Sequence, residues 1–283
     1  MTIRVSAILC FLLVFSMIQP GFGQKRERGY FAWALKGEFR PFIEANYGIG
    51  TPKHLDFSET FAKYGLIEAR VGYSEIIKYR HSIYEMDERF AFGNYLSSDA
   101  DFLDDKSGNI KSEVTRFGVG NRLGYGYRIG AINLLPYNQN QFIWSRIQTE
   151  RPEDIIPEDE SILNRYEGSY RFGVSGEAGA KLELFESLAV QGGFEFAVVY
   201  PRHIFWPWLG SYIIVQTGLG MVSAFSEDIV KSSPIFGPIA YFLLKNGIAY
   251  AFYTGLQKRM NWPFDSETPI TFETYKIGAS IKF

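Results

Sequence analysis

The feature that most constrains the fold is a two-residue alternation of side-chain character along Thr271 to Phe283. Successive side chains of a β-strand point to opposite faces of the sheet, so such a segment has one apolar and one polar face. The apolar positions are Tyr275, Ile277, Ala279, Ile281 and Phe283, and the positions between them are Lys276, Gly278, Ser280 and Lys282. The segment therefore predicts a two-faced strand.

The same alternation recurs along the chain, with charged residues on the polar face. It predicts strands at Phe42–Gly50, Tyr64–Glu75, Thr115–Arg128, Ser169–Phe185 and Leu188–Tyr200. In a soluble sandwich the apolar faces would pack inward, whereas in a membrane barrel they would contact lipid and the charged faces would line the lumen. Periodicity alone does not choose between these two arrangements.

The first residues are typical of a secretory signal peptide, Met1–Gly23. Arg4 supplies a positive start, and the apolar core Val5–Ile18 is too short for a transmembrane helix. Gly21-Phe22-Gly23 fits a small-x-small cleavage site, which would leave Gln24 as the first mature residue. A glutamine at this place resembles exported proteins of the Bacteroidota. We therefore expect residues 1–23 to be removed and residues 24–283 to form one domain.

Composition narrows the class of protein. The net charge of −2 gives no electrostatic case for nucleic acid as a partner. The only cysteine, Cys10, lies in the expected leader, which excludes disulfides and cysteine chemistry from the mature chain. The 17% aromatic content and 28 glycines suit a barrel with aromatic girdles and a crowded interior. The nearest approach to a helical span, Trp208–Phe225, is interrupted by three glycines.

The last strand also resembles the C-terminal targeting signal of Gram-negative outer-membrane β-barrels. That signal has a terminal Phe, apolar residues at alternate positions and a Tyr near its start, as in Tyr275, Ile277, Ala279, Ile281 and Phe283. The resemblance implies an all-β, antiparallel transmembrane barrel that reaches the cell outer membrane after Sec export. It implies outer-membrane lipid and the barrel assembly machinery as partners, and it points to no particular family.

The strand count is expected to be ten, within a range of eight to twelve. One strand is expected near Arg89–Leu96, before an acidic loop, and another near Ala131–Trp144, where Pro136 suggests a bulge or irregular pairing. Ile235–Lys245 and Ile248–Leu256, joined by Asn246-Gly247, read as a hairpin with a type I′ turn.

The segment Pro201–Pro234 breaks the alternation. A strand near Tyr212–Val222 would make the strand total odd, which conflicts with both chain ends lying in the periplasm. A helix packed in or over the barrel mouth would restore an even count. Both readings stay open, and the segment is apolar enough to plug the lumen or dock a protein partner.

Charged residues on the polar faces are the candidate site, because all would share one lumen. If they pair and fill a narrow interior the barrel is closed, and if they line a wider one it is a wet pore. Since buried charges must pair, we expect Arg116, Arg122 and Arg128 to face glutamates on neighbouring strands. The predicted lumen set is Glu44, Glu68, Arg70, Arg116, Arg122, Arg128, Glu177, Lys181, Glu183 and Glu195, with Lys276 and Lys282 from the last strand.

Catalytic and metal chemistry have little support in the sequence. Gly173–Glu177 misses the G-x-S-x-G pattern at its last position. The three histidines, His54, His81 and His203, lie on different segments and make a poor metal site. We expect no metal site, no cofactor and no enzymatic activity. We interpret His203, which lies near two tryptophans in the sequence, as an interfacial residue.

The expected function is passive: a small pore or transport-associated barrel. The alternative is a closed structural or assembly barrel that acts through its external loops or through residues 201–234. A third alternative is a lipid-modifying enzyme, for which His203 would be the reactive candidate.

Overall fold

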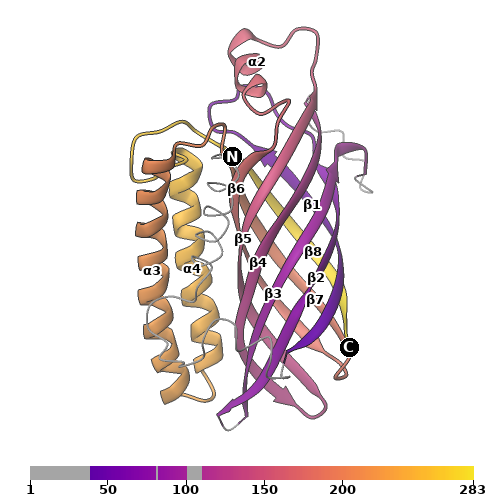
Figure 1. The fold of residues 1–283 in the computed structure, drawn as a ribbon, viewed down its shortest axis with the longest axis vertical. Helices are drawn as coiled ribbons and strands as arrows, with labels where there is room; N and C mark the ends of the chain where they lie inside the picture. The colour runs from indigo at the N-terminus through magenta and orange to yellow at the C-terminus, as the bar shows by residue number, and fades with distance from the viewer. Residues whose placement is uncertain (1–38, 81, 101–109) are drawn as a thin grey trace, which may run out of the picture.

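The computed structural model describes residues 39–80, 82–100 and 110–283, and its body is a closed barrel of eight antiparallel strands (Figure 1). The strands follow chain order, and β1 closes the barrel against β8. They are β1 (Arg40–Lys53), β2 (Tyr64–Arg80), β3 (Ile83–Ser97), β4 (Lys111–Ile129), β5 (Ile132–Glu150), β6 (Arg171–Glu183), β7 (Leu188–Val199) and β8 (Ile270–Lys282). The expected antiparallel barrel is confirmed; the expected signal peptide, Met1–Gly23, lies outside the described residues.

The expected count of ten strands was wrong, because the two strands assigned to residues 235–256 form one helix, α4 (Gly237–Lys258). A short apolar run does not by itself distinguish a strand from a helix. Pro238 lies in the first turn, where its missing N–H costs no hydrogen bond. The Asn246-Gly247 pair continues the helix instead of forming the expected type I′ turn.

Pro136 interrupts the pairing of β5 with β4, one of the two expected outcomes, but it does not cause a bulge. The β4–β5 register is the same on both sides of it, with Gly124 opposite Tyr137 and Tyr127 opposite Leu134. Proline has no N–H, so it removes a bond from the ladder without shifting the register. The register shift lies elsewhere, between β2 and β3 at Lys78/Arg80.

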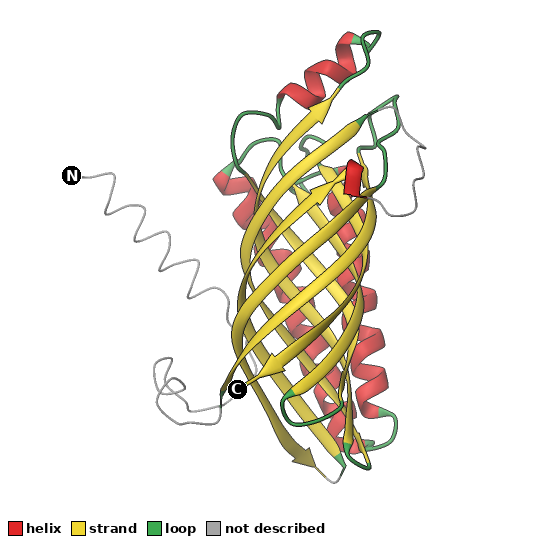
Figure 2. Ribbon diagram, turned by 90° about the vertical axis from the view of Figure 1, so that its right-hand side faces the viewer, coloured by secondary structure: helices red, strands yellow, loops and turns green. Residues whose placement is uncertain are grey.

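The two ends of the barrel differ (Figures 1 and 2). Short connections join β2 to β3, β4 to β5 and β6 to β7 at the end where the chain terminates. Long connections lie at the other end, including the 3-10 turn Ser98–Ala100 and the helix α2 (Pro157–Asn164). Short periplasmic turns and long external loops are typical of outer-membrane barrels.

Between β7 and β8 the chain forms a helical hairpin that lies along the outside of the barrel (Figure 1). It consists of α3 (Phe205–Ser232) and α4, so the segment near Tyr212–Val222 is helical. Helix α4 packs against β4, β5, β6 and β7, and α3 packs on α4. Within the described residues, α3 is the one helix long and apolar enough to cross a membrane, with a mean hydropathy of 1.3. The hairpin covers the barrel wall and does not plug the lumen.

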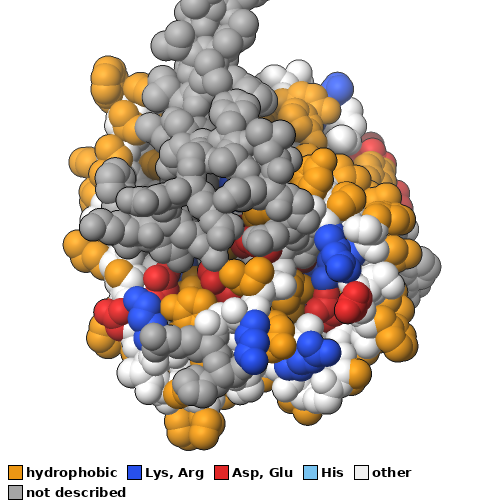
Figure 3. Space-filling model, turned by 60° about the horizontal axis from the view of Figure 1, so that its bottom comes forward, with side chains coloured by type: hydrophobic (Ala, Val, Ile, Leu, Met, Phe, Trp, Pro, Cys, Tyr) orange, Lys and Arg blue, Asp and Glu red, His pale blue; other side chains and the backbone are white. Residues whose placement is uncertain are grey.

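The barrel is apolar outside and charged inside. Ile67, Val71 and Ile277 point outward and expose 63%, 55% and 67% of their surface. Viewed toward the end with the short turns, hydrophobic side chains lie around much of the circumference, and most of the visible Lys, Arg, Asp and Glu side chains lie on the end face between them (Figure 3). This distribution is the reverse of that in a soluble protein and is the arrangement of a barrel embedded in lipid.

Candidate functional site

The predicted lumen residues point into the barrel. Nine of the ten are almost completely buried, namely Glu44, Glu68, Arg70, Arg116, Arg122, Glu177, Lys181, Glu183 and Glu195, and Lys276 is buried with them. Glu88 of β3 is a further buried carboxylate of the lumen that was not in the predicted set. Glu88 lies on the inward face of its strand, like the other lumen residues. It directly precedes Arg89, where that strand was expected to begin.

Arg70 on β2 lies at the centre of the network. Its Nη1 is 3.1 Å from Glu44 Oε1, and its Nη2 is 2.6 Å from Glu68 Oε1 and 3.0 Å from Glu177 Oε2. Glu177 belongs to β6, so this contact crosses the lumen. The guanidinium also donates to Gln139 Oε1 at 2.8 Å. One arginine thereby joins three strands of the barrel to its own.

Arg122 on β4 forms a second node. Its Nη1 is 3.0 Å from Glu44 Oε2 on β1 and 2.7 Å from Glu88 Oε2 on the neighbouring β3. Its guanidinium carbon lies 4.4 Å from the ring centroid of Tyr137. Lys181 Nζ, from β6, lies 2.6 Å from the other oxygen of Glu88. Arg122 therefore has one glutamate on a neighbouring strand, as expected, and another on the opposite wall.

Arg116 and Lys276 form a third node around Glu195. Arg116 Nη1 lies 2.9 Å from Glu195 Oε1, and Lys276 Nζ lies 2.6 Å from Glu195 Oε2. Lys276 also lies 2.5 Å from Glu177 Oε2, which links this node to Arg70. Arg116 is on β4 and Glu195 on β7, so the partner lies across the lumen and not on a neighbouring strand.

Charges of opposite sign balance in these three nodes. The five cations are Arg70, Arg116, Arg122, Lys181 and Lys276, and the five carboxylates are Glu44, Glu68, Glu88, Glu177 and Glu195. Balance is required because an unpaired buried charge would be costly. An eight-stranded barrel has an interior that side chains can fill, and here they meet across it.

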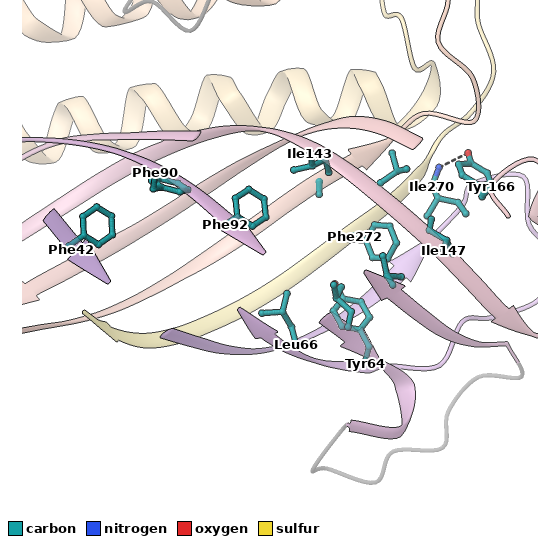
Figure 4. Close-up of a cluster of buried hydrophobic side chains, with 14 residues drawn as sticks. Phe42, Tyr64, Leu66, Phe90, Phe92, Ile143, Ile147, Tyr166, Ile270 and Phe272 are labelled. Carbon is teal, nitrogen blue, oxygen red and sulfur yellow. Dashed lines mark hydrogen bonds between the residues drawn. The ribbon is translucent and has the colours of Figure 1, made fainter. Parts of the chain in front are cut away.

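Most of the apolar side chains in the lumen lie on the external side of the ion pairs, whereas Phe42 lies beside Lys181 toward the short-turn end (Figure 4). Tyr64 and Phe272 pack with ring centroids 5.9 Å apart, and the Tyr64 hydroxyl is 2.7 Å from Thr274 Oγ1. The Tyr166 hydroxyl accepts a hydrogen bond from the N–H of Ile270 at 2.9 Å, as the dashed line in Figure 4 shows. This bond joins the β5–β6 loop, which carries Tyr166, to the apolar side chains at the external end of the lumen.

Arg128 differs from the other predicted lumen residues. It has the inward phase of β4 but is exposed at the rim with the short turns. It donates to Tyr84 Oη and to the carbonyl of Gly130, instead of to the expected glutamate. Lys282 pairs with Glu183 near the same rim. At the end of the barrel, water solvates the charge of Arg128, so this residue needs no ion-pair partner.

The external loops form ordered contacts above the barrel. Asp159 in α2 accepts hydrogen bonds from the backbone N–H groups of Ser58 and Glu59, each at 3.2 Å. His54 Nε2 lies 3.1 Å from the carbonyl oxygen of Thr268. Burial lowers the pKa of His54 from its ordinary value of 6.5, although Asp56 and this carbonyl act in the opposite direction.

A polar seam holds the helical hairpin to the barrel, and sequence reasoning missed it. Asn138 on β5 points outward and donates to Asn246 Oδ1 on α4 at 2.8 Å. Asn246 Nδ2 donates to Phe242 O at 2.9 Å, and Asn140 Nδ2 donates to Asn138 Oδ1 at 3.0 Å. The signal was present, because Asn138 and Asn140 occupy the outward phase, which lipid contact should keep apolar.

Next to the seam, the hairpin and the barrel wall enclose a partly open cavity of about 150 Å³, which we call the hairpin cleft. Its wall is largely aromatic and aliphatic, with Phe142 and Phe196 on the barrel and Trp208 and Tyr212 on α3. Its polar lining includes Asn121, Asn140, Gln216 and Lys245. The Lys245 ammonium donates to Leu219 O at 3.0 Å and to Ser223 Oγ.

The histidines do not come together. His203 lies against Phe172 and Trp208, with ring centroids 5.5 and 5.2 Å away, and His54 lies in a different loop. His81 lies outside the described residues. Within the described part of the chain, no group of three or more His, Cys, Asp or Glu side chains is arranged to hold a metal ion.

Comparison with known proteins gave only distant structural similarity. No family model and no curated protein matches the chain. Neisserial surface protein A (NspA) is similar at 8% identity, with a TM-score of 0.38 over 86% of this chain and 97% of NspA. Ail, the attachment invasion locus protein of Yersinia pestis, is similar at 8% identity, with a TM-score of 0.31 over 87% of this chain and 99% of Ail. The assignment of the barrel to a membrane rests on its own surface.

Proposed function

We propose that this outer-membrane barrel is closed, is not an enzyme, and acts as a scaffold that presents its external loops and its α3–α4 hairpin. The supporting observation is the set of ion pairs that cross the lumen, from Arg70 to Glu177, Arg116 to Glu195 and Arg122 to Glu44. All six side chains are at most 3% exposed, which favours a filled interior over the pore that the sequence also allowed.

The hairpin is the most distinctive surface of this scaffold. At 1.5 Å per residue, the 28 residues of α3 and the 22 of α4 have lengths of roughly 42 and 33 Å, sufficient for a bilayer core of about 30 Å. Ile213, Met221 and Phe225 of α3 are exposed, as lipid contact requires. Outer-membrane lipid is the proposed partner, and residues 201–234 could also seat a protein partner in the membrane plane.

Conductance of the refolded protein in a planar bilayer tests the closed lumen. A heat-dependent gel shift first establishes that the barrel is folded, and a known porin in the same bilayer serves as the positive control. We expect no discrete current steps. Reproducible steps from the folded barrel would contradict a closed lumen and restore the pore.

A further inference from the structure

We propose that the hairpin cleft binds a long-chain fatty acid, with its carboxylate at Lys245 and its chain along the aromatic wall of the cleft. The inference rests on the proposed role of the outer surface and adds a ligand class to it. The cleft lies on the outside of the barrel, between α3, α4 and the wall formed by β4–β7, and is separate from the ion pairs of the lumen.

The position of Lys245 is the first reason. It lies near the middle of α4, which runs alongside the barrel and therefore at membrane depth. An ionisable residue at this depth is costly and marks a functional site more often than a structural one. Only 9% of Lys245 is exposed, so its charge is removed from both lipid and water.

The hydrogen bonding of Lys245 is the second reason. An ammonium group carries three N–H donors, and the acceptors it has among the described residues, Leu219 O and Ser223 Oγ, are both uncharged. A ligand carboxylate would supply an anionic acceptor, and such charge-assisted bonds are about twice as strong as neutral ones. The amide side chains of Asn121 and Asn140 line the same cavity and can donate to a second oxygen.

The shape and lining of the cleft are the third reason. Its volume of about 150 Å³ is comparable to that of a cavity that admits one benzene molecule, so it can take the carboxyl group and the first few carbons. The rest of the chain would lie along Tyr212 and Trp208, which line the cavity toward the external end of α3. Because the cleft lies beside membrane helices, an acyl chain can enter it directly from the bilayer without crossing water.

Quenching of tryptophan fluorescence by a dibrominated fatty acid tests the site, because Trp208 lines it. The folded full-length mature protein in phosphatidylcholine vesicles would be titrated with dibromostearic acid and, separately, with its uncharged methyl ester. We expect saturable quenching by the acid at concentrations roughly tenfold lower than by the ester, since only the acid gains a charge-assisted bond. Equal affinity for acid and ester would overturn the assignment of a carboxylate ligand.

Two variants of one helix separate the cleft from the surrounding lipid. Ala249→Leu fills the cavity, whereas Ala251→Leu adds the same atoms at an exposed position two residues away. We expect Ala249→Leu to abolish saturable quenching and Ala251→Leu to retain it; equal quenching in both would show binding to bulk lipid and overturn the site. Lys245→Met should remove the preference for acid over ester, and it decides the matter if Ala249→Leu does not fold. Current steps in the bilayer assay would overturn the closed lumen but leave these titrations unchanged.

Discussion

At the scale of single residues, Arg122 tests whether the interior network holds the barrel together. It is buried against Glu44 and Glu88, so Arg122→Met would leave Glu44 paired with Arg70 and Glu88 with Lys181, but the buried network would lack one positive charge. Breaking one side of a buried ion pair costs about 3–5 kcal/mol. We expect the urea midpoint of unfolding, followed by the heat-dependent gel shift, to fall by a corresponding amount.

Arg128→Met is the matched control for this change. Arg128 lies on the same strand and in the same inward phase, but it is exposed at the rim, where its partners are Tyr84 and a backbone carbonyl. We expect its loss to change the free energy of unfolding by about 0.5 kcal/mol or less, and therefore to shift the urea midpoint little. Equal effects of the two substitutions would mean that the network contributes nothing specific to stability.

The Asn138–Asn246 hydrogen bond makes a separate prediction, for attachment of the hairpin. Asn138→Leu leaves the Asn246 amide with fewer partners on the membrane side of the barrel, and we expect a cost of about 1 kcal/mol. Asn138→Leu combined with Asn246→Leu should recover part of this loss, because lipid and leucine are equally apolar. A urea double-mutant cycle measures the coupling, expected to be about 0.6 kcal/mol; zero coupling would contradict the seam.

At the scale of elements, the external β1–β2 loop should loosen in mild acid. Burial lowers the pKa of His54, so the folded state favours the neutral ring next to Thr268. The stabilisation is complete above the ordinary pKa of 6.5 and is lost as the pH falls through the lowered pKa. We expect the melting temperature to fall between pH 7.5 and pH 5, and His54→Phe to reduce that fall. His203 remains in both proteins, so an identical pH dependence would exclude His54 as the cause.

Strands were predictable from the sequence to the extent that their environment is two-sided. β4 and β8 separate lumen from lipid, and alternation located both, together with their inward residues. Helix α4 faces the barrel wall on one side and the bilayer on the other, so apolar residues occur all around it. An element surrounded by apolar groups has no period to read, and an Asn-Gly pair within it resembles a turn. The same reasoning explains why the cross-lumen partners of Arg116 and Arg122 required a three-dimensional structure.

For the whole molecule, the barrel and the hairpin are separable in topology. β7 pairs with β8 along their full lengths, and Val199 is opposite Ile270 where the hairpin leaves the barrel. A short turn in place of residues 201–268 would therefore join two strands that are already neighbours. We expect this deletion to yield a folded, heat-modifiable barrel with a lower urea midpoint, because Asn138 and Asn140 would then face lipid.

Restoring an apolar wall distinguishes the two ways in which the deletion could fail. Replacing Asn121, Asn138 and Asn140 with leucine in the shortened chain removes the outward polar groups that α4 covers in the intact protein. If the hairpin only covers this face, the leucine variant should recover the lost stability, since each strand then has a continuous lipid-facing side. If neither shortened chain gives a heat-modifiable barrel, the helices are needed to close β7 against β8, and the hairpin is part of the folding unit. Recovery would instead identify it as a module added to a complete barrel, held there by its seam and its cleft.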